Sequence, residues 1–240
     1  MKETTIINPV NTIIELTYRM EKKEKFAFVN ISRSALSSLL PDAEKKPPKY
    51  FLKSIAKCIE TNDENFLKAV PSEYSIDIEN GKYATLGIEK NSKLYDANMF
   101  DYYCANRKEV VDIFVNHYIK DSKNVILSFH DQKTVQKVFG QNQIIVTVPY
   151  NNYYDKLDAI VDQLSEYDGI VDCVILDCPL LATAIAPKIW EKLTMSIIDF
   201  GKVVSSSRFQ ATSAEKDRPA RSYSKDRPAK NFNSKRNEKR

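Results

Sequence analysis

Two patterns of apolar residues, a recurrence every three or four positions and short continuous runs, alternate along this chain and predict a mixture of helices and strands. Over residues 9–22 an apolar side chain recurs every three or four positions, and Asn8 followed by Pro9 supplies a typical helix start. Residues 25–31 form a short continuous apolar run, which indicates a buried strand. The same criteria predict further helices at residues 32–40, 50–61, 97–105, 108–119, 133–139, 154–167 and 180–193. They predict further strands at residues 125–128, 144–148, 171–176 and 196–200.

The order of these elements predicts the fold class. Strands and helices alternate with short links after residue 125, which favours a mostly parallel sheet flanked by helices, a Rossmann-like α/β fold. Between residues 66 and 89 the pattern is weaker, and alternating apolar residues around Asn80-Gly81 predict a hairpin. Pro187 is expected to kink or restart the helix over residues 180–193.

Ligands of open α/β sheets bind beyond the carboxyl ends of the strands, so the segments that follow the strands are the expected location of a site. These segments are residues 30–33, 128–131, 149–152, 177–179 and 201–204.

Charge divides the chain into two parts. Of the 36 Lys and Arg residues, eleven follow residue 204, together with only four of the 32 Asp and Glu residues. Residues 205–240 therefore carry a net charge of +7 and residues 1–204 a net charge of −3, although the whole chain is only +4. The last 36 residues also lack Leu, Ile and Val, so they cannot bury enough apolar surface to fold. We expect one domain at residues 1–204 and a disordered basic tail at residues 205–240.

Several classes of protein are disfavoured. The four cysteines form no CxxC pair and the two histidines complete no familiar zinc spacing, so buried free thiols and no metal site are expected. No apolar run is long enough to cross a membrane and no signal peptide opens the chain, which predicts a cytoplasmic protein. With five glycines, the chain contains neither a GxGxxG nor a GxxxxGK[ST] phosphate loop, and it has no G-x-S-x-G elbow.

Three groups of residues remain as candidates for chemistry. Ser128, His130 and Asp131 follow a strand, but helix capping is the favoured interpretation of this trio. Asp177 and Asp199 end two late strands and could hold Mg²⁺ or Mn²⁺, or could instead bond to loop amides. Residues 149–154 (PYNNYY) could stack a base or sugar, or their asparagines could cap the next helix.

Two of these strand ends resemble the GT-D type of glycosyltransferase domain, a Rossmann-like fold that uses nucleotide sugars. Residues 26–35 (FAFVNISRSA) are similar to the family's first strand, F-x-x-x-R-[YI]-G-D-G-E. Residues 174–186 and 196–202 (SIIDFGK) are similar to its late region, L-x-L-G-P-T-A followed by A-[IV]-D-[IL]-G-H. The resemblance covers nearly all of residues 1–204, and it implies a sugar-nucleotide site with Mn²⁺ or Mg²⁺ as cofactor.

The chain departs from the family's motifs at the positions that matter for the metal. Arg33 and Ala35 stand where the resemblance places the metal-binding D-x-E carboxylates. Asn30 replaces the family's arginine, Cys178 its late glycine and Lys202 its histidine, and Asp199 alone is kept. Because Arg33 would repel a cation but could pair with a phosphate, we expect a pseudoenzyme that binds without a metal. Its expected ligand-binding residues are Asn30, Arg33, Asn151, Cys178 and Lys202, and Asp177 and Asp199 are the candidate catalytic residues if catalysis persists.

The tail contains a repeat, because KDRPA at residues 216–220 recurs at residues 225–229. Cations interleaved with single aromatic rings suit RNA or single-stranded DNA, and an acidic protein surface or no fixed partner are the alternatives. The expected nucleic-acid contacts are Arg218, Arg221, Tyr223, Arg227, Lys230, Phe232, Lys235 and Arg236.

Three functions remain open. The preferred one is a non-catalytic binding or scaffold protein, whose Lys-, Asn- and Ile-rich composition suits a virus or bacteriophage and hence the host cytoplasm or a virion. The alternatives are an active metal-dependent glycosyltransferase that uses a nucleotide sugar such as a UDP-sugar, and a simple RNA- or ssDNA-binding protein. A homo-oligomer is compatible with each of them.

Overall fold

The computed structural model describes residues 6–40, 46–88 and 93–204. Eight strands form a single sheet in the order β1-β4-β3-β2-β8-β7-β5-β6, and every pair of neighbours is parallel. The strands are β1 (Ile6–Ile7), β2 (Ala27–Asn30), β3 (Phe66–Val70), β4 (Leu94–Asp96), β5 (Asn124–Ser128), β6 (Ile144–Thr147), β7 (Cys173–Asp177) and β8 (Ser196–Asp199). The predicted Rossmann-like α/β class is therefore confirmed, with a sheet that is wholly parallel.

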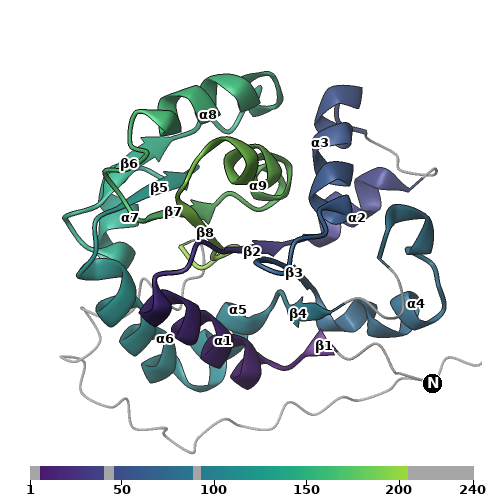
Figure 1. The fold of residues 1–240 in the computed structure, drawn as a ribbon, viewed down its shortest axis with the longest axis horizontal. Helices are drawn as coiled ribbons and strands as arrows, with labels where there is room; N and C mark the ends of the chain where they lie inside the picture. Colours follow the sequence, from purple (N-terminus) through teal and green to yellow (C-terminus); the bar gives the residue numbers. More distant parts are fainter. Residues whose placement is uncertain (1–5, 41–45, 89–92, 205–240) are drawn as a thin grey trace, which may run out of the picture.

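Helices cover both faces of this sheet (Figure 1). One face packs against α2 (Arg33–Leu39), α3 (Lys49–Glu60), α8 (Leu157–Ser165) and α9 (Pro179–Lys192). The other packs against α1 (Pro9–Lys22), α5 (Met99–Asn106), α6 (Lys108–Phe114) and α7 (Gln132–Phe139). A π-helical turn, Val115–Lys120, extends α6.

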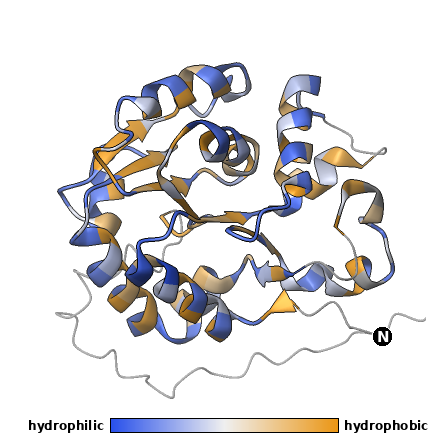
Figure 2. Ribbon diagram, in the orientation of Figure 1, coloured by the Kyte–Doolittle hydropathy of each residue, from blue (hydrophilic) through white to orange (hydrophobic). Residues whose placement is uncertain are grey.

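Hydrophobic residues concentrate in the strands and on the helix faces that meet them, as Figure 2 shows. The central strands β2, β5 and β7 are buried along their whole length, because helices cover them on both sides. All four cysteines are buried and free, as the sequence predicted. No helix within the described ranges is long and apolar enough for a membrane span.

The predicted hairpin around Asn80-Gly81 is wrong. Residues 72–86 instead form α4 (Ser75–Glu79) between two short 3₁₀ turns, Ser72–Tyr74 and Ala84–Leu86. Ile78 is fully buried whereas Ile76 is 67% exposed. Tyr74 and Ile78, four residues apart, both contribute to the core on the α2–α3 side, so a helical turn fits these few residues better than a strand.

Pro187 does not restart the last helix, since α9 runs through it to Lys192. Most of α9 is buried, and it packs against α3 and β2. This packing compensates for the hydrogen bond that the proline cannot donate. The predicted helix over residues 154–167 begins as a 3₁₀ turn, Tyr153–Lys156, before α8.

Candidate functional site

A long cleft follows the carboxyl edge of the sheet. Its larger part, of about 830 Å³, lies beyond β5, β6 and β7, and a second part of about 560 Å³ lies beyond β2, β3 and β4. The two parts share Ser34, Pro179, Gly201 and Lys202, so they meet beside β2 and β8. The connections that leave the neighbouring strands β5 and β7 run in opposite directions, to β6 and to β8, so the larger part lies where open α/β sheets bind ligands.

Asp199 ties the end of β8 to β2. Its Oδ2 accepts a 3.1 Å hydrogen bond from the Asn30 backbone N–H, and its Oδ1 accepts one of 2.8 Å from the Gly201 N–H. Burial raises the pKa of Asp199 to about 7, although both hydrogen bonds act in the opposite direction. Asp199 therefore bonds to backbone amides of the neighbouring strand end and loop, which is the second of the two roles that the sequence left open for this carboxylate.

The side chain of Asn30 belongs to the same network and also lines the cleft. Its Nδ2 donates to the Asp199 carbonyl at 3.1 Å, whereas its Oδ1 is buried with no hydrogen-bond partner among the described residues. Gly201 has a φ of 66°, and a Cβ at that position would lie 3.3 Å from Asn30 Nδ2. Glycine therefore permits both the turn and the close approach of the loop to Asn30.

Asp177, at the end of β7, lies in a second network. Its Oδ2 accepts a 2.7 Å hydrogen bond from Ser128 Oγ, and Ser128 Oγ accepts one of 3.0 Å from the His130 N–H. The His130 imidazole Nε2 lies 3.9 Å from the same carboxylate oxygen. Burial raises the pKa of Asp177 to about 7. Asp177 and His130 both line the larger part of the cleft.

The structure divides the predicted trio of Ser128, His130 and Asp131. Asp131 caps α7 by accepting a 3.0 Å hydrogen bond from the Thr134 N–H, which confirms the capping interpretation for that residue. His130 and Ser128 instead meet Asp177, which is 49 residues from Ser128 along the chain. Sequence reasoning missed this constellation because residues on β5 and β7 become neighbours only when the sheet assembles.

The predicted ligand-binding residues occupy different places. Arg33, Asn30 and Lys202 line the smaller part of the cleft, and Asn151 and Lys202 line the larger part. Cys178 is fully buried, and burial raises the pKa of its thiol well above the usual value. Its side chain therefore packs in the core, and it is not one of the cleft-lining residues.

Arg33 extends from the first turn of α2 with 68% of its side chain exposed. One of its terminal nitrogens donates to Glu73 at 2.6 Å, which leaves the guanidinium further N–H donors. Ala35, the other position where the resemblance expects a carboxylate, is fully buried.

Aromatic rings form the outer wall of the larger part of the cleft. Phe129 contacts Tyr150 and Tyr153 edge to face or tilted, with ring centroids 5.4 Å and 5.3 Å apart. Tyr150 is 75% exposed. Asn152 precedes the 3₁₀ turn but its side chain makes no capping bond, so this segment presents rings to the cleft and does not act as a helix cap.

A divalent metal of the kind implied by the family resemblance does not fit these residues. Within the described ranges, no three His, Cys, Asp or Glu side chains are grouped as metal ligands. Along β7, Asp177 is on the same face of the sheet as Ile175, which packs in the core under α1, α5, α6 and α7. Along β8, Asp199 is on the same face as Ile197, which packs in the core on the other side of the sheet. The two carboxylates therefore project to alternate sides of the sheet.

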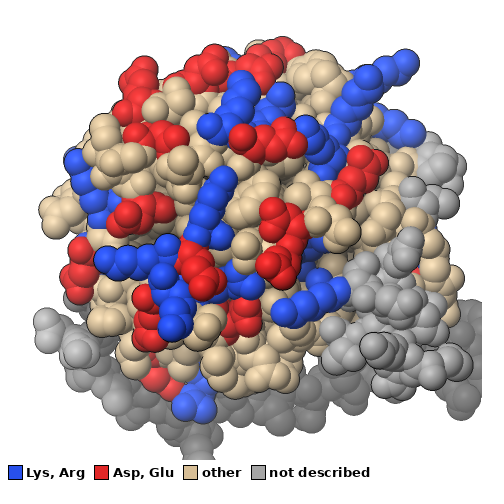
Figure 3. All heavy atoms as spheres, viewed as in Figure 1, with Lys and Arg blue, Asp and Glu red and all other residues tan. Residues whose placement is uncertain are grey.

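Charges on the face drawn in Figure 3 are mixed, with Lys and Arg next to Asp and Glu. The eight predicted nucleic-acid contacts, from Arg218 to Arg236, all lie outside the described residues.

Comparison with known proteins relates the fold to glycosyltransferases. No protein-family model matches the sequence, and no curated protein matches it. A solved structure of the highly conserved domain of unknown function 1792 (DUF1792), described as having a distinct glycosyltransferase fold, aligns with 84% of this chain and 79% of its own. Its TM-score is 0.63 and its sequence identity 13%.

A second solved structure, described as a new glycosyltransferase (DUF1792) from Streptococcus sanguinis, covers 84% of this chain and 83% of its own. Its TM-score is 0.62 and its identity 16%. The predicted GT-D-type, glycosyltransferase-like fold is confirmed. At such low identity the likeness extends to the fold alone, and the predicted viral or bacteriophage origin stays a prediction.

Proposed function

We propose that this chain binds a nucleotide sugar in the cleft at the carboxyl edge of the sheet, and that it does so without a divalent metal. The observation that carries the proposal is that the cation Arg33 lines the cleft. The family resemblance expects a metal-binding carboxylate at this position. A guanidinium can pair with phosphate oxygens directly. The sequence favoured a non-catalytic binding or scaffold protein on a glycosyltransferase-like fold; the proposal keeps the binding function and names a nucleotide sugar as the ligand.

The rest of the cleft supplies complementary groups. Lys202 lines both parts of the cleft and adds a second cation for a diphosphate. Asn30 Oδ1, a buried acceptor, can take a hydrogen bond from a sugar hydroxyl. Tyr150 and Tyr153 present rings on which a base or sugar can stack. Glu73 competes for Arg33 through its 2.6 Å ion pair, and a phosphate would have to share or displace that contact.

Calorimetric titration with UDP-glucose tests the proposal. We expect equal affinity in EDTA and in Mn²⁺, and a loss of about tenfold or more in Arg33→Ala, since one charge-assisted hydrogen bond contributes roughly 1.5–3 kcal/mol. Arg107→Ala is the matched control, because Arg107 also forms an exposed ion pair, with Glu109 at 2.7 Å, but does not line the cleft.

Binding that requires Mn²⁺ would contradict the proposal and would favour the metal-dependent glycosyltransferase. Equal affinity of Arg33→Ala and Arg107→Ala would show that Arg33 does not contact the ligand.

We propose a separate nucleic-acid contact for residues 205–240, supported by their net charge of +7 and by the KDRPA repeat. Residues 1–204 carry a net negative charge, so residues 205–240 are the part of the chain that attracts phosphates more strongly.

A further inference from the structure

His130 is the most accessible titratable side chain of the network around Asp177. It lines the cleft with 33% of its side chain exposed, whereas the Asp177 side chain is 1% exposed. Ser128 holds both residues, because its hydroxyl donates to Asp177 and accepts from the His130 backbone N–H. Residues of two neighbouring strands, β5 and β7, therefore hold the backbone of His130 and place a carboxylate near its ring.

This arrangement has the parts of a general base. A histidine positioned by a carboxylate on one ring nitrogen can accept a proton on the other. Here Nε2 faces Asp177 Oδ2 at 3.9 Å, which leaves Nδ1 for a hydroxyl in the cleft. The separation is longer than a hydrogen bond, and such contacts commonly tighten when substrate binds.

Resting on the proposed nucleotide-sugar binding, we propose that His130 is the catalytic base of a metal-independent glycosyl transfer and that Asp177 is its positioning residue. The acceptor hydroxyl gives its proton to His130 Nδ1 while its oxygen forms a bond to the anomeric carbon. The bond between that carbon and the phosphate oxygen breaks, and its electron pair leaves with the nucleoside diphosphate. The proton on His130 then passes to water.

The charges around the cleft suit this step. Lys202 lines the same part of the cleft as His130, and Arg33 lines the adjoining smaller part, so both can reach a departing diphosphate where the two parts meet. In its ionised form, which predominates above about pH 7, Asp177 stabilises the imidazolium that forms on His130. Two ionisable groups that interact with Asp177 are Cys178, whose thiol is fully buried, and Asp199, which is held by the Asn30 and Gly201 amides. Neither of these lines the larger part of the cleft.

The test measures binding and turnover separately, with UDP-glucose in EDTA. Calorimetry gives the dissociation constant, and release of UDP in the presence of a panel of simple sugars gives turnover. We expect His130→Asn to lower the rate of UDP release about 100-fold or more while changing the dissociation constant less than threefold. Asp177→Asn is expected to lower the rate in the same way.

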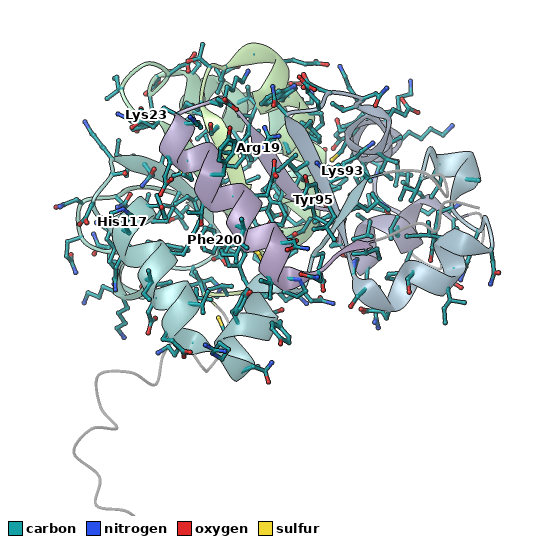
Figure 4. The ribbon with its side chains drawn as sticks, turned by 60° about the horizontal axis from the view of Figure 1, so that its bottom comes forward. Arg19, Lys23, Lys93, Tyr95, His117 and Phe200 are labelled. Carbon is teal, nitrogen blue, oxygen red and sulfur yellow. The ribbon has the colours of Figure 1, made fainter. Side chains whose placement is uncertain are left out.

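His117→Asn is the matched control, because His117 is the other histidine of the chain and lies on the π-helical turn beside α1 (Figure 4), away from the cleft. Its rate should equal that of the wild type. With only two imidazoles, ¹⁵N NMR can assign their tautomers. We expect His130 to carry its proton on Nε2 in the wild type and to lose that preference in Asp177→Asn, a change that a merely structural aspartate would not produce.

Binding of UDP-glucose without release of UDP would overturn this inference and leave the proposed binding function intact. Equal rates for His130→Asn and the wild type would also overturn it. Absence of binding would overturn both proposals.

Discussion

Burial decides the behaviour of the ionisable residues at the carboxyl edge. Asp177 and Asp199 each have a pKa raised to about 7, and desolvation is the largest cause in both. By contrast, Lys188 lowers the pKa of Asp158, an exposed residue of α8, through a 2.9 Å hydrogen bond. The pKa values of identical side chains therefore shift in opposite directions, upward where burial removes water and downward where a cation lies close.

This difference predicts how the stability of the protein depends on pH. In the unfolded chain Asp177 ionises near its usual pKa of 3.8, but in the folded protein it does so near 7. The folded state therefore holds the extra proton between about pH 4 and pH 7, and the stability that this provides is lost as pH rises through that interval. We expect the free energy of unfolding of Asp177→Asn to fall less from pH 5 to pH 8 than that of the wild type, by an amount on the order of 2 kcal/mol.

Urea unfolding at the two pH values measures this effect. Asp158→Asn is the control, because the pKa of Asp158 is lowered and its contribution to stability is lost only as pH falls below about 3.8. From pH 5 to pH 8 its free energy of unfolding should therefore change as that of the wild type does. An unchanged pH dependence in Asp177→Asn would contradict the burial argument.

Individual helices depend on local caps as well as on packing. Among the helices of the described ranges, three begin with a side chain that accepts a backbone hydrogen bond: Asn8 at α1, Ser32 at α2 and Asp131 at α7. Local rules identified the Asn8 cap, since a capping residue next to a proline has the same meaning in any fold. The cap at Ser32 also matters for the cleft, because it fixes the turn from which Arg33 extends.

Replacing the cap of α2 should therefore weaken both folding and binding. Ser32 Oγ accepts a 3.2 Å hydrogen bond from the Ala35 N–H, and Ser32→Ala is expected to cost about 1 kcal/mol in the free energy of unfolding. We also expect weaker binding of UDP-glucose, since the first turn of α2 would fray. Chemical denaturation and calorimetry measure the two effects, with Asn8→Ala as control, because Asn8 caps α1 and does not line the cleft. If both variants bind UDP-glucose equally well, the cap has no part in positioning Arg33.

At the scale of the whole molecule, the sheet brings distant segments together at one edge. β2 pairs with β8, whose residues are about 170 positions later in the chain, and this pairing places Asn30 against Asp199 and Gly201. Val203 and Val204, which follow β8, are fully buried in the core beneath α1 and α6.

Removal of residues 205–240 should leave this core unchanged, because the two valines are retained. We expect the truncated chain to unfold at the same urea concentration as the full chain. In fluorescence anisotropy with single-stranded RNA, we expect the full chain to bind with a steep salt dependence, and the truncated chain to lose that binding.

Substitution of Tyr223 and Phe232 by Ala in the full chain would separate ring stacking from charge, since it keeps all eleven cations of the tail. Unchanged affinity after truncation would eliminate the proposed nucleic-acid contact.

The periodicity of the sequence identified most elements that later form the centre of the sheet. Residues 125–128, 171–176 and 196–200 were predicted as strands because strands buried on both faces are continuously apolar. Other elements were not predicted: β1, β4 and the turns around Asn80 contain too few residues for either pattern to stand out, and Lys68 interrupts the apolar run of β3. The resemblance at residues 26–35 and 196–202 correctly indicated the glycosyltransferase-like fold.

By itself, the sequence determined the alternation of strands and helices, the caps at Asn8 and Asp131, and the unequal charge of residues 1–204 and 205–240. Only the tertiary structure decided which polar side chains share one cleft, because neighbours in a parallel sheet are separated by whole crossover segments. It placed Cys178 in the core, turned Asp199 toward the Asn30 and Gly201 amides, and set His130 against Asp177. Local propensities act over a few residues, whereas this cleft depends on contacts between residues up to about 170 positions apart.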